Sequence, residues 1–265
     1  MQLDAIAVEA GVRLEALASV GSTNTEARIR ARRGERAPLW ITAVAQSEGR
    51  GRMDRSWVSP VGNLYASLLL REPSLPERAP ELAFVAALAL RDAIVAAAPA
   101  LASQLGFKWP NDLLLAGDKC AGILIEGEVE PGESLSVVIG IGVNCASHPP
   151  AAAYPATDLA AHGADLAPER LFQHLSATMC GRIAQWERGR GFPAMLGDWL
   201  SAARGIGDEI TVRHGGSEKH GRFVGLDRSG RLVLQLRGGG TEKISAGDVF
   251  PFKFHGGRRV PSRAE

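Results

Sequence analysis

The residues best suited to chemistry lie in the segment Gly49-Arg50-Gly51-Arg52-Met53-Asp54-Arg55-Ser56-Trp57, which we call the arginine loop. Glycine lets a backbone N–H approach a ligand closely, and arginine presents a planar fork of donors that matches phosphate oxygens. Such a loop can close over a small anion. Because G-R-G-R sequences also occur in solvated nucleic-acid-binding segments, the loop alone leaves both interpretations open.

Three further segments add charge and glycine. In Lys108-Trp109-Pro110-Asn111-Asp112 a carboxylate follows an extended Trp-Pro pair, although Pro-Asn-Asp also favours a simple tight turn. In Lys119-Cys120-Ala121-Gly122 the lysine falls one hairpin later, near the turn, where a lone lysine is usually solvated. The alternate glycines of Gly140-Ile141-Gly142-Val143-Asn144 leave one sheet face bare for a flat ligand, a neighbouring helix or a bulge. The arginine loop and the two lysine segments together indicate an enzyme that forms and then consumes a phosphate anhydride.

Composition narrows the class of protein. The 265 residues are 45% hydrophobic, and 30 basic residues against 29 acidic ones leave a net charge of +1, which argues against a protein that coats DNA. Cys120, Cys145 and Cys180 are too widely spaced for a disulfide framework or a zinc site, so we expect no bound metal and a reducing, cytoplasmic location. The longest apolar stretch, 82–98, is interrupted by a charged pair and predicts a buried helix, not a membrane span.

Apolar periodicity and turn signals locate the elements that must position these residues. A helix is expected to start within 20–26, where Thr23 and Glu26 have capping-box spacing, and to stop at Gly34. Short turns between consecutive strands imply antiparallel pairing. The expected strands are 39–46, 63–70, 107–109, 112–115, 121–128 and 135–144, and the other expected helices are 80–98, 168–188 and 192–203.

The pattern becomes all-β after Arg204-Gly205. Short strands are expected at 209–213, 221–226, 231–236 and 241–244, with glycine-rich turns between them. About fifty residues with this spacing are typical of a small barrel. We therefore predict a catalytic domain over 1–205, a β-barrel over 206–254 and a disordered tail over 255–265.

Taken in order, these segments resemble the biotin–protein ligases, in the short form without a DNA-binding domain. The resemblance covers Ser19 to about Phe250. It implies an α+β fold with a mixed, largely antiparallel central sheet and flanking helices, like a class II synthetase, followed by an SH3-like barrel. The matching residues are Gly21-Ser22-Thr23-Asn24, Gln46, Gly49-Arg50-Gly51-Arg52 with Trp57, Lys108-Trp109-Pro110-Asn111-Asp112, Lys119 with Ala121-Gly122-Ile123-Leu124, Gly140-Ile141-Gly142-Val143-Asn144 and Tyr154-Pro155-Ala156-Thr157-Asp158-Leu159.

The resemblance implies a two-step reaction. Biotin attacks the α-phosphate of ATP to give biotinyl-5′-adenylate, and a lysine of a biotin carboxyl carrier protein, a subunit of acetyl-CoA carboxylase, then takes the biotin. Magnesium would accompany ATP, bound mainly through phosphates and waters. Arg52 and Lys119 would hold the developing phosphate charge, Arg50 and Arg55 would assist, and Asp112 would orient the incoming lysine or carry its proton. The implied catalytic residues are Arg52, Lys119, Asp112 and Lys108.

The resemblance also implies a binding set. Ser22, Thr23, Asn24 and Gln46 match positions that contact biotin, and Trp57 matches a position that stacks on adenine. The full set is Ser22, Thr23, Asn24, Gln46, Gly49, Arg50, Gly51, Arg52, Arg55, Trp57, Asn111, Lys119, Gly122, Gly140, Gly142 and Asn144.

Asp54 departs from the family pattern, which usually has glycine there. The aspartate places negative charge beside an anion site, but it tolerates left-handed backbone angles better than most residues. About twenty residues precede Gly21, too few for a helix-turn-helix domain, so we expect no specific DNA binding. No membrane partner is expected, and a homodimer stays open. The alternative functions are a lipoate–protein ligase or octanoyl transferase, which shares the catalytic fold, and a non-catalytic nucleic-acid binder.

Overall fold

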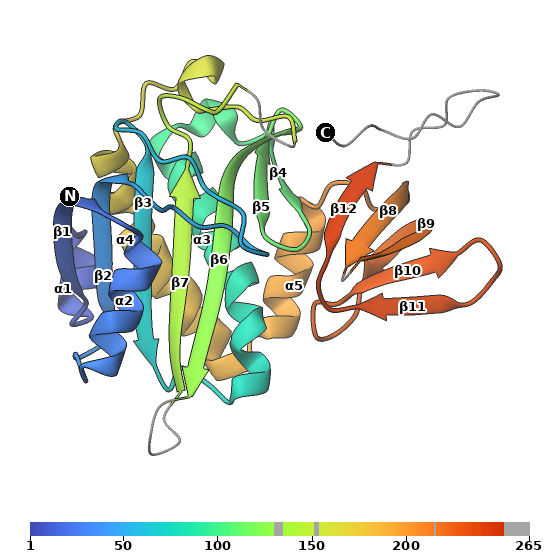
Figure 1. The fold of residues 1–265 in the computed structure, drawn as a ribbon, viewed down its shortest axis with the longest axis horizontal. Helices are drawn as coiled ribbons and strands as arrows, with labels where there is room; N and C mark the ends of the chain where they lie inside the picture. The colour runs from blue at the N-terminus through green and yellow to red at the C-terminus, as the bar shows by residue number, and fades with distance from the viewer. Residues whose placement is uncertain (130–134, 151–153, 215, 252–265) are drawn as a thin grey trace. The chain divides into compact units, whose positions relative to one another are not determined.

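The computed structural model describes residues 1–129, 135–150, 154–214 and 216–251 (Figure 1). The chain divides into two compact units, Met1–Ala203 and a second unit that begins at Arg204. The sequence predicted a domain boundary between 205 and 206, which is two residues after the boundary between Ala203 and Arg204 in the structure. The predicted tail, 255–265, lies outside the described residues.

The first unit is built on a seven-stranded sheet with the order β1-β2-β3-β7-β6-β5-β4. β1 runs parallel to β2, and the remaining neighbours pair antiparallel. The sheet is therefore mixed and largely antiparallel, which confirms the predicted α+β class. The strands are β1 (Arg13–Val20), β2 (Leu39–Gln46), β3 (Leu64–Arg71), β4 (Leu105–Lys108), β5 (Asp112–Leu115), β6 (Asp118–Val129) and β7 (Leu135–Val143).

Helices cover both faces of this sheet. In Figure 1, α2 (Thr23–Arg32) lies in front of the strands, and α3 (Leu82–Ala97) and α4 (Pro168–Trp186) run behind them and pack on each other. Because both faces are covered, β3 is buried over Leu64–Leu70 and is apolar there except at Ser67. The remaining helices of this unit are α1 (Ala5–Glu9) and α5 (Phe192–Ser201), with short 3₁₀ turns at Pro76–Glu81, Pro99–Leu101, Ala160–His162 and Glu187–Gly189.

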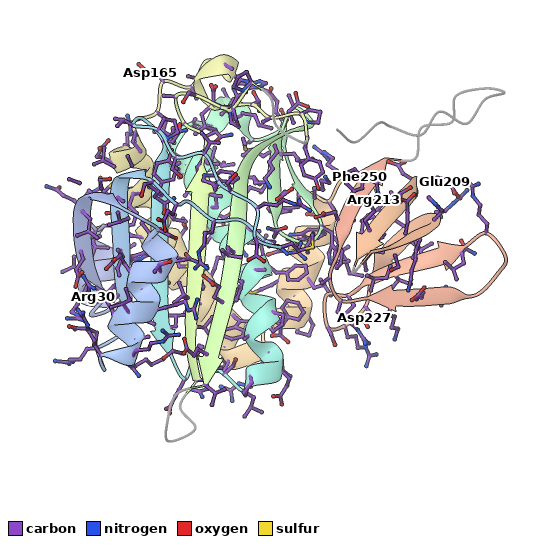
Figure 2. All side chains as sticks on the ribbon, viewed as in Figure 1. Arg30, Asp165, Glu209, Arg213, Asp227 and Phe250 are labelled. Atoms are coloured by element: carbon purple, nitrogen blue, oxygen red, sulfur yellow. The ribbon has the colours of Figure 1, made fainter. Side chains whose placement is uncertain are left out.

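Two side-chain contacts fix the elements that carry the site. Arg30 of α2 (Figure 2) pairs with Glu15 of the edge strand β1 at 3.0 Å, which ties the helix to the sheet. Trp199 of α5 stacks on Phe107 of β4, with ring centroids 5.4 Å apart. The second contact buries the strand whose last residue is Lys108.

The second unit is a five-stranded sheet with the order β11-β10-β9-β8-β12, in which every described pair is antiparallel. Its interior is apolar, with Phe223 and Leu232 fully buried. The Arg213 guanidinium lies 4.8 Å from the ring centroid of Phe250 (Figure 2). The strands are β8 (Glu209–His214), β9 (Ser217–Leu226), β10 (Leu232–Leu236), β11 (Thr241–Ile244) and β12 (Asp248–Pro251).

Several predicted elements are confirmed at their bounds, including β2, β5 and β11. α1, β1 and β12 were not predicted. The predicted capping box is wrong, because Ser22 and not Thr23 is the N-cap of α2, and the Ser22 side chain makes no capping hydrogen bond. The Thr23 N–H instead donates to the Oε1 atom of Gln46, at 2.8 Å. No described helix has the length and apolar character needed to cross a bilayer.

Candidate active site

The predicted site residues gather at one end of the sheet of the first unit. They come from the end of β2, the start of α2, the β4–β5 turn, the start of β6 and the last residues of β7. The arginine loop leaves β2 and returns to β3 at this same end (Figure 1). Antiparallel pairing places the start of β6 beside the end of β7, since Gly122 is the cross-strand partner of Gly142.

The arginine loop folds as a tight hairpin. The Gly51 N–H donates to the Arg55 carbonyl at 2.6 Å, and the Trp57 N–H donates to the Gly49 carbonyl at 2.8 Å. At the tip, Met53 and Asp54 have φ angles of +53° and +55°. Two-residue hairpin turns with positive φ at both central positions match the twist of the flanking strands, and aspartate tolerates this conformation. Asp54 therefore has a backbone role where the family usually has glycine.

Asp112 lies among the lysines of the site. The Lys119 Nζ atom is 2.5 Å from Asp112 Oδ1, and Lys108 is the cross-strand partner of Asp112. Burial lowers the pKa of Lys108 below 10.5 against the opposing effect of Asp112, and the charges of Lys119 and Arg55 lower it further. The carboxylate therefore offsets part of the repulsion between cations that the fold holds close together.

Arg52 points to the β4–β5 turn. Its Nη1 atom donates to Asn111 Oδ1 at 3.2 Å, and the Asn111 amide donates to the Ile123 carbonyl at 2.7 Å. Burial lowers the pKa of Arg52, while the charge of Asp112 opposes that shift. An arginine stays protonated despite such a shift, so Arg52 supplies fixed positive charge.

Tyr154 joins two further cations. Arg55 Nη1 donates to the Tyr154 hydroxyl at 2.9 Å, and Lys108 Nζ lies 4.4 Å from the centroid of the same ring. The segment after Tyr154 is held against β6, because the Lys119 N–H donates to the Pro155 carbonyl at 3.0 Å. The sequence matched this segment to the family but gave Tyr154 no role.

The bare sheet face predicted from the alternate glycines is covered by Trp57. A Cβ atom on Gly142 would lie 2.6 Å from Trp57 Nε1, and one on Gly122 would lie 3.1 Å from Trp57 Cζ3. Lys119 Nζ is 5.5 Å from the indole centroid. The glycines therefore give the indole room to lie on the sheet beside a cation.

A chain of hydrogen bonds links the start of α2 to the arginine loop. Both the N–H and the hydroxyl of Thr23 donate to Gln46 Oε1, at 2.8 Å and 3.1 Å. Gln46 Nε2 donates to Ser59 Oγ at 2.9 Å, and that hydroxyl donates to the Trp57 carbonyl at 2.8 Å. Gly49 is required here, because a Cβ atom would overlap the Trp57 carbonyl and Ser59.

The Asn24 side chain packs directly on Gly140 of the sheet. The Ser67 hydroxyl, across the β3–β7 pair from Gly140, donates to Asn24 Oδ1 at 2.6 Å. Asn24 Nδ2 donates to Glu126 Oε2 at 2.7 Å, and Glu126 also accepts from Arg50 Nη2 at 2.8 Å. Ser22, the N-cap residue of α2 and two residues before Asn24, is also buried, with 4% of its surface exposed.

Asn144 follows the end of β7 and hydrogen-bonds to two neighbouring backbone segments. The side chain is buried, and Asn144 Nδ2 donates to the Thr157 carbonyl at 3.0 Å. The Asn144 N–H donates to the Cys120 carbonyl at 2.8 Å. The structure therefore uses Asn144 to hold the segment after Tyr154 in place.

The cysteines that flank the site motifs are buried. Burial raises the pKa of Cys120 and of Cys145 to about 12, so both remain thiols at neutral pH. Within the described ranges, no group of three or more His, Cys, Asp or Glu residues is arranged to hold a metal ion.

Sequence reasoning missed four polar residues of the site: Ser59, Ser67, Glu126 and Tyr154. Ser67 is a fully buried hydroxyl inside the apolar strand β3, and that interruption is the one signal the sequence offers. Glu126 looks like the solvent-facing position of an alternating strand. Its partners are remote in sequence, so no local pattern marks it.

Comparison with known proteins identifies the family of the chain. Residues 17–144 match the biotin/lipoate A/B protein ligase family, and residues 205–250 match the C-terminal domain of biotin protein ligases. Over 242 residues the chain is 40% identical to the biotin–[acetyl-CoA-carboxylase] ligase of Paracoccus denitrificans, with 88% of this chain and 98% of that relative covered. The chain therefore belongs to the biotin/lipoate A/B protein ligase family.

Two further proteins are similar over most of this chain. The bifunctional ligase/repressor of Bacillus subtilis is 34% identical over 216 residues, which cover 79% of this chain and 65% of that relative. The biotin protein ligase from Aquifex aeolicus in complex with biotin and ATP has the same fold, with a TM-score of 0.75 and 24% identity. That match covers 90% of this chain and 97% of the other.

The close packing of Asn24 on Gly140 is testable. A Cβ atom at position 140 would overlap Asn24 Oδ1, so Gly140→Ala should lower the free energy of unfolding by about 1–3 kcal/mol, as overpacking does. Urea denaturation of the whole chain measures this. Gly127→Ala on β6 is the matched control, because its Cβ would meet only Leu135, at 3.9 Å. Equal stability of the two variants would contradict the packing.

Proposed function

We propose that this chain is an ATP-dependent ligase that activates biotin as biotinyl-5′-AMP and transfers it to a lysine of a biotin carboxyl carrier protein. The observation that carries the proposal is the cluster of cations around Asp112, which is connected through Trp57 to the hydrogen-bonded polar side chains at the start of α2. The relative that is 40% identical over 88% of this chain is a biotin–[acetyl-CoA-carboxylase] ligase, which supports both the substrate and the carrier.

The first step joins two anions. A carboxylate oxygen of biotin attacks the α-phosphorus of ATP, and pyrophosphate leaves. Arg52 and Lys119 lower the barrier, because fixed positive charge stands where the phosphate oxygens gain negative charge. Both are positioned by other residues before substrate arrives, Arg52 by Asn111 and Lys119 by Asp112.

The second step forms an amide. The ε-amine of the carrier lysine attacks the carbonyl of the adenylate, the bond to the phosphate oxygen breaks, and AMP leaves. The amine must lose a proton on the way. Asp112 is the carboxylate at the centre of the site, so we assign it the orientation of the incoming ammonium or the acceptance of its proton.

The remaining assignments follow from the same site. Ser22, Thr23, Asn24 and Gln46 would hold the biotin end. Trp57, which lies against Gly122 and Gly142, would stack on adenine. Magnesium would accompany ATP and would be held mainly by the phosphates and by waters, so it would need few protein ligands. We infer a cytoplasmic enzyme without specific DNA binding. Residues 5–20 form α1 and the sheet strand β1 and so belong to the ligase fold.

ATP–pyrophosphate exchange tests the proposal directly. Purified protein should exchange labelled pyrophosphate into ATP in the presence of biotin and not with lipoate, because only a substrate carboxylate that forms an adenylate makes the step reversible. Exchange with lipoate alone would mean that the substrate is lipoate and not biotin, on the same catalytic fold. A folded sample that shows exchange with neither biotin nor lipoate would refute the proposed ligase activity.

Removal of either fixed charge should sharply reduce adenylation without unfolding the protein. Arg52→Ala and Lys119→Ala should each lower kcat for exchange by about 10²–10³, the usual cost of losing one preorganised charge donor. Circular dichroism and melting temperature check the fold. Arg33→Ala, at an exposed position beyond α2, is the control and should keep full activity. Near-normal exchange in either site variant removes that residue from the catalytic set.

The lowered pKa of Lys108 predicts a pH effect. A lysine is charged below its pKa and neutral above it, so Lys108 loses its charge at a lower pH than an ordinary lysine at 10.5. If adenylation needs that charge, Lys108→Arg should move the alkaline limb of the pH–rate profile of exchange to higher pH, since arginine stays protonated. Lys243→Arg, in the second unit, should leave the profile unchanged. Coincident alkaline limbs in wild type and Lys108→Arg would show that this charge is not needed.

A further inference from the structure

The backbone of Lys119 is held between two strands. On one side it pairs with β5. On the other side the pairing of β6 with β7 begins only at Ala121, so β7 gives Lys119 no partner. The segment 155–157 takes that place as a short parallel strand, because the Lys119 N–H donates to the Pro155 carbonyl and the Thr157 N–H donates to the Lys119 carbonyl, both at 3.0 Å. The position of Lys119 therefore depends on where this short strand lies.

A buried carboxylate, that of Asp158, follows the short strand directly. Only 8% of this side chain is exposed. Asp158 Oδ1 accepts from the Ala161 N–H at 2.7 Å, and Asp158 Oδ2 lies 2.6 Å from His148 Nδ1. Ala161 belongs to the turn Ala160–His162, which precedes α4, and His148 belongs to the segment that follows β7. One carboxylate therefore fixes the end of the short strand to the turn after it and to a neighbouring segment.

Asn144 provides a second anchor for the same segment. Its Nδ2 atom donates to the Thr157 carbonyl at 3.0 Å, and its carbonyl accepts from the Leu159 N–H at 3.1 Å. A buried carboxylate is stable only while its oxygens are hydrogen-bonded, so Asp158 resists any shift that separates it from its partners. Because Asn144 remains, loss of the Asp158 carboxylate loosens the short strand without detaching it from β6.

We propose that Asp158 is a positioning residue, which fixes the short strand 155–157 beside β6 and thereby the backbone from which Lys119 reaches the site. Lys119 Nζ lies 2.5 Å from Asp112 Oδ1, so a shift of the Lys119 backbone moves this cation away from the centre of the site. Small misplacements of a group that acts on a reacting phosphate lower the rate strongly. The effect on catalysis rests on the function proposed above, whereas the effect on the short strand does not.

Amide hydrogen exchange, followed by NMR on the full chain, tests the structural effect. The matched control for Asp158→Ala is Asp165→Ala, which removes a carboxylate from an exposed position further along the same connection (Figure 2). In Asp158→Ala the amides of Lys119 and Thr157 should exchange about five- to thirtyfold faster, the factor that corresponds to the loss of a capping carboxylate. Asp165→Ala should match wild type. Equal exchange in the two variants, or an equal rise in the buried helix α3, would overturn the proposal.

Pyrophosphate exchange tests the effect on catalysis. Asp158→Ala should lower kcat by about five- to thirtyfold and leave KM for biotin nearly unchanged, because Lys119 acts on charge that develops in the transition state. Asp158→Asn should recover most of the lost rate, since an amide can accept from the Ala161 N–H and donate to a neutral His148 ring. A raised KM for biotin with unchanged kcat would contradict the positioning role. So would an Asp158→Asn variant that is as slow as Asp158→Ala.

A double variant separates the positioning of Lys119 from a general loss of stability. If Asp158 acts through Lys119, then Asp158→Ala should lower kcat no further in a protein that already carries Lys119→Ala. Effects that multiply fully in the double variant would refute the coupling. If wild type shows no biotin-dependent exchange of pyrophosphate, the proposed function fails, while amide hydrogen exchange still decides whether Asp158 fixes the short strand.

Discussion

Repulsion between like charges is the constraint on which the site depends. The reaction calls for several cations at one end of one sheet, and in the absence of a phosphate these cations repel each other. In the fold, each cation contacts an acceptor or an aromatic ring from another part of the first unit. The site therefore forms only when the whole first unit is folded. The matched contacts are Arg50 with Glu126, Arg52 with Asn111, Arg55 with Tyr154, Lys108 with the Tyr154 ring and Lys119 with Asp112.

Close approach to the sheet is the second constraint, and it explains the glycines of β6 and β7. Asn24 lies on Gly140, and Trp57 lies on Gly142 and Gly122. Any side chain at these positions would lift the helix start or the loop away from the strands, and the contacts with Glu126 and Lys119 would be lost. The backbone therefore determines how near the polar groups come to each other, and the charges determine where they stay.

The sequence predicts most of the fold because its strands are buried and regular. β2 and β5 fall at their predicted bounds, and both are apolar runs closed by turn signals. β1 escapes prediction because it is an edge strand whose burial alternates irregularly, so its apolar pattern is weak. Motif residues such as Arg52 and Lys119 were identifiable by their type and order, whereas Glu126 was not, because its meaning comes from partners 76 and 102 residues away in the chain.

Burial gives the two kinds of cation different uses. Withdrawal from water strengthens the attraction of a cation for a phosphate, and it also lowers the pKa of that cation. Arg52 can bear that shift and stay charged at any physiological pH, which suits a group that must always meet a phosphate. Lys108 cannot bear it as far, because its pKa starts lower than that of an arginine and burial lowers it further. Arg52 therefore supplies the more permanent charge and Lys108 the one more sensitive to pH, and the charge of Asp112 opposes the downward pKa shift of both.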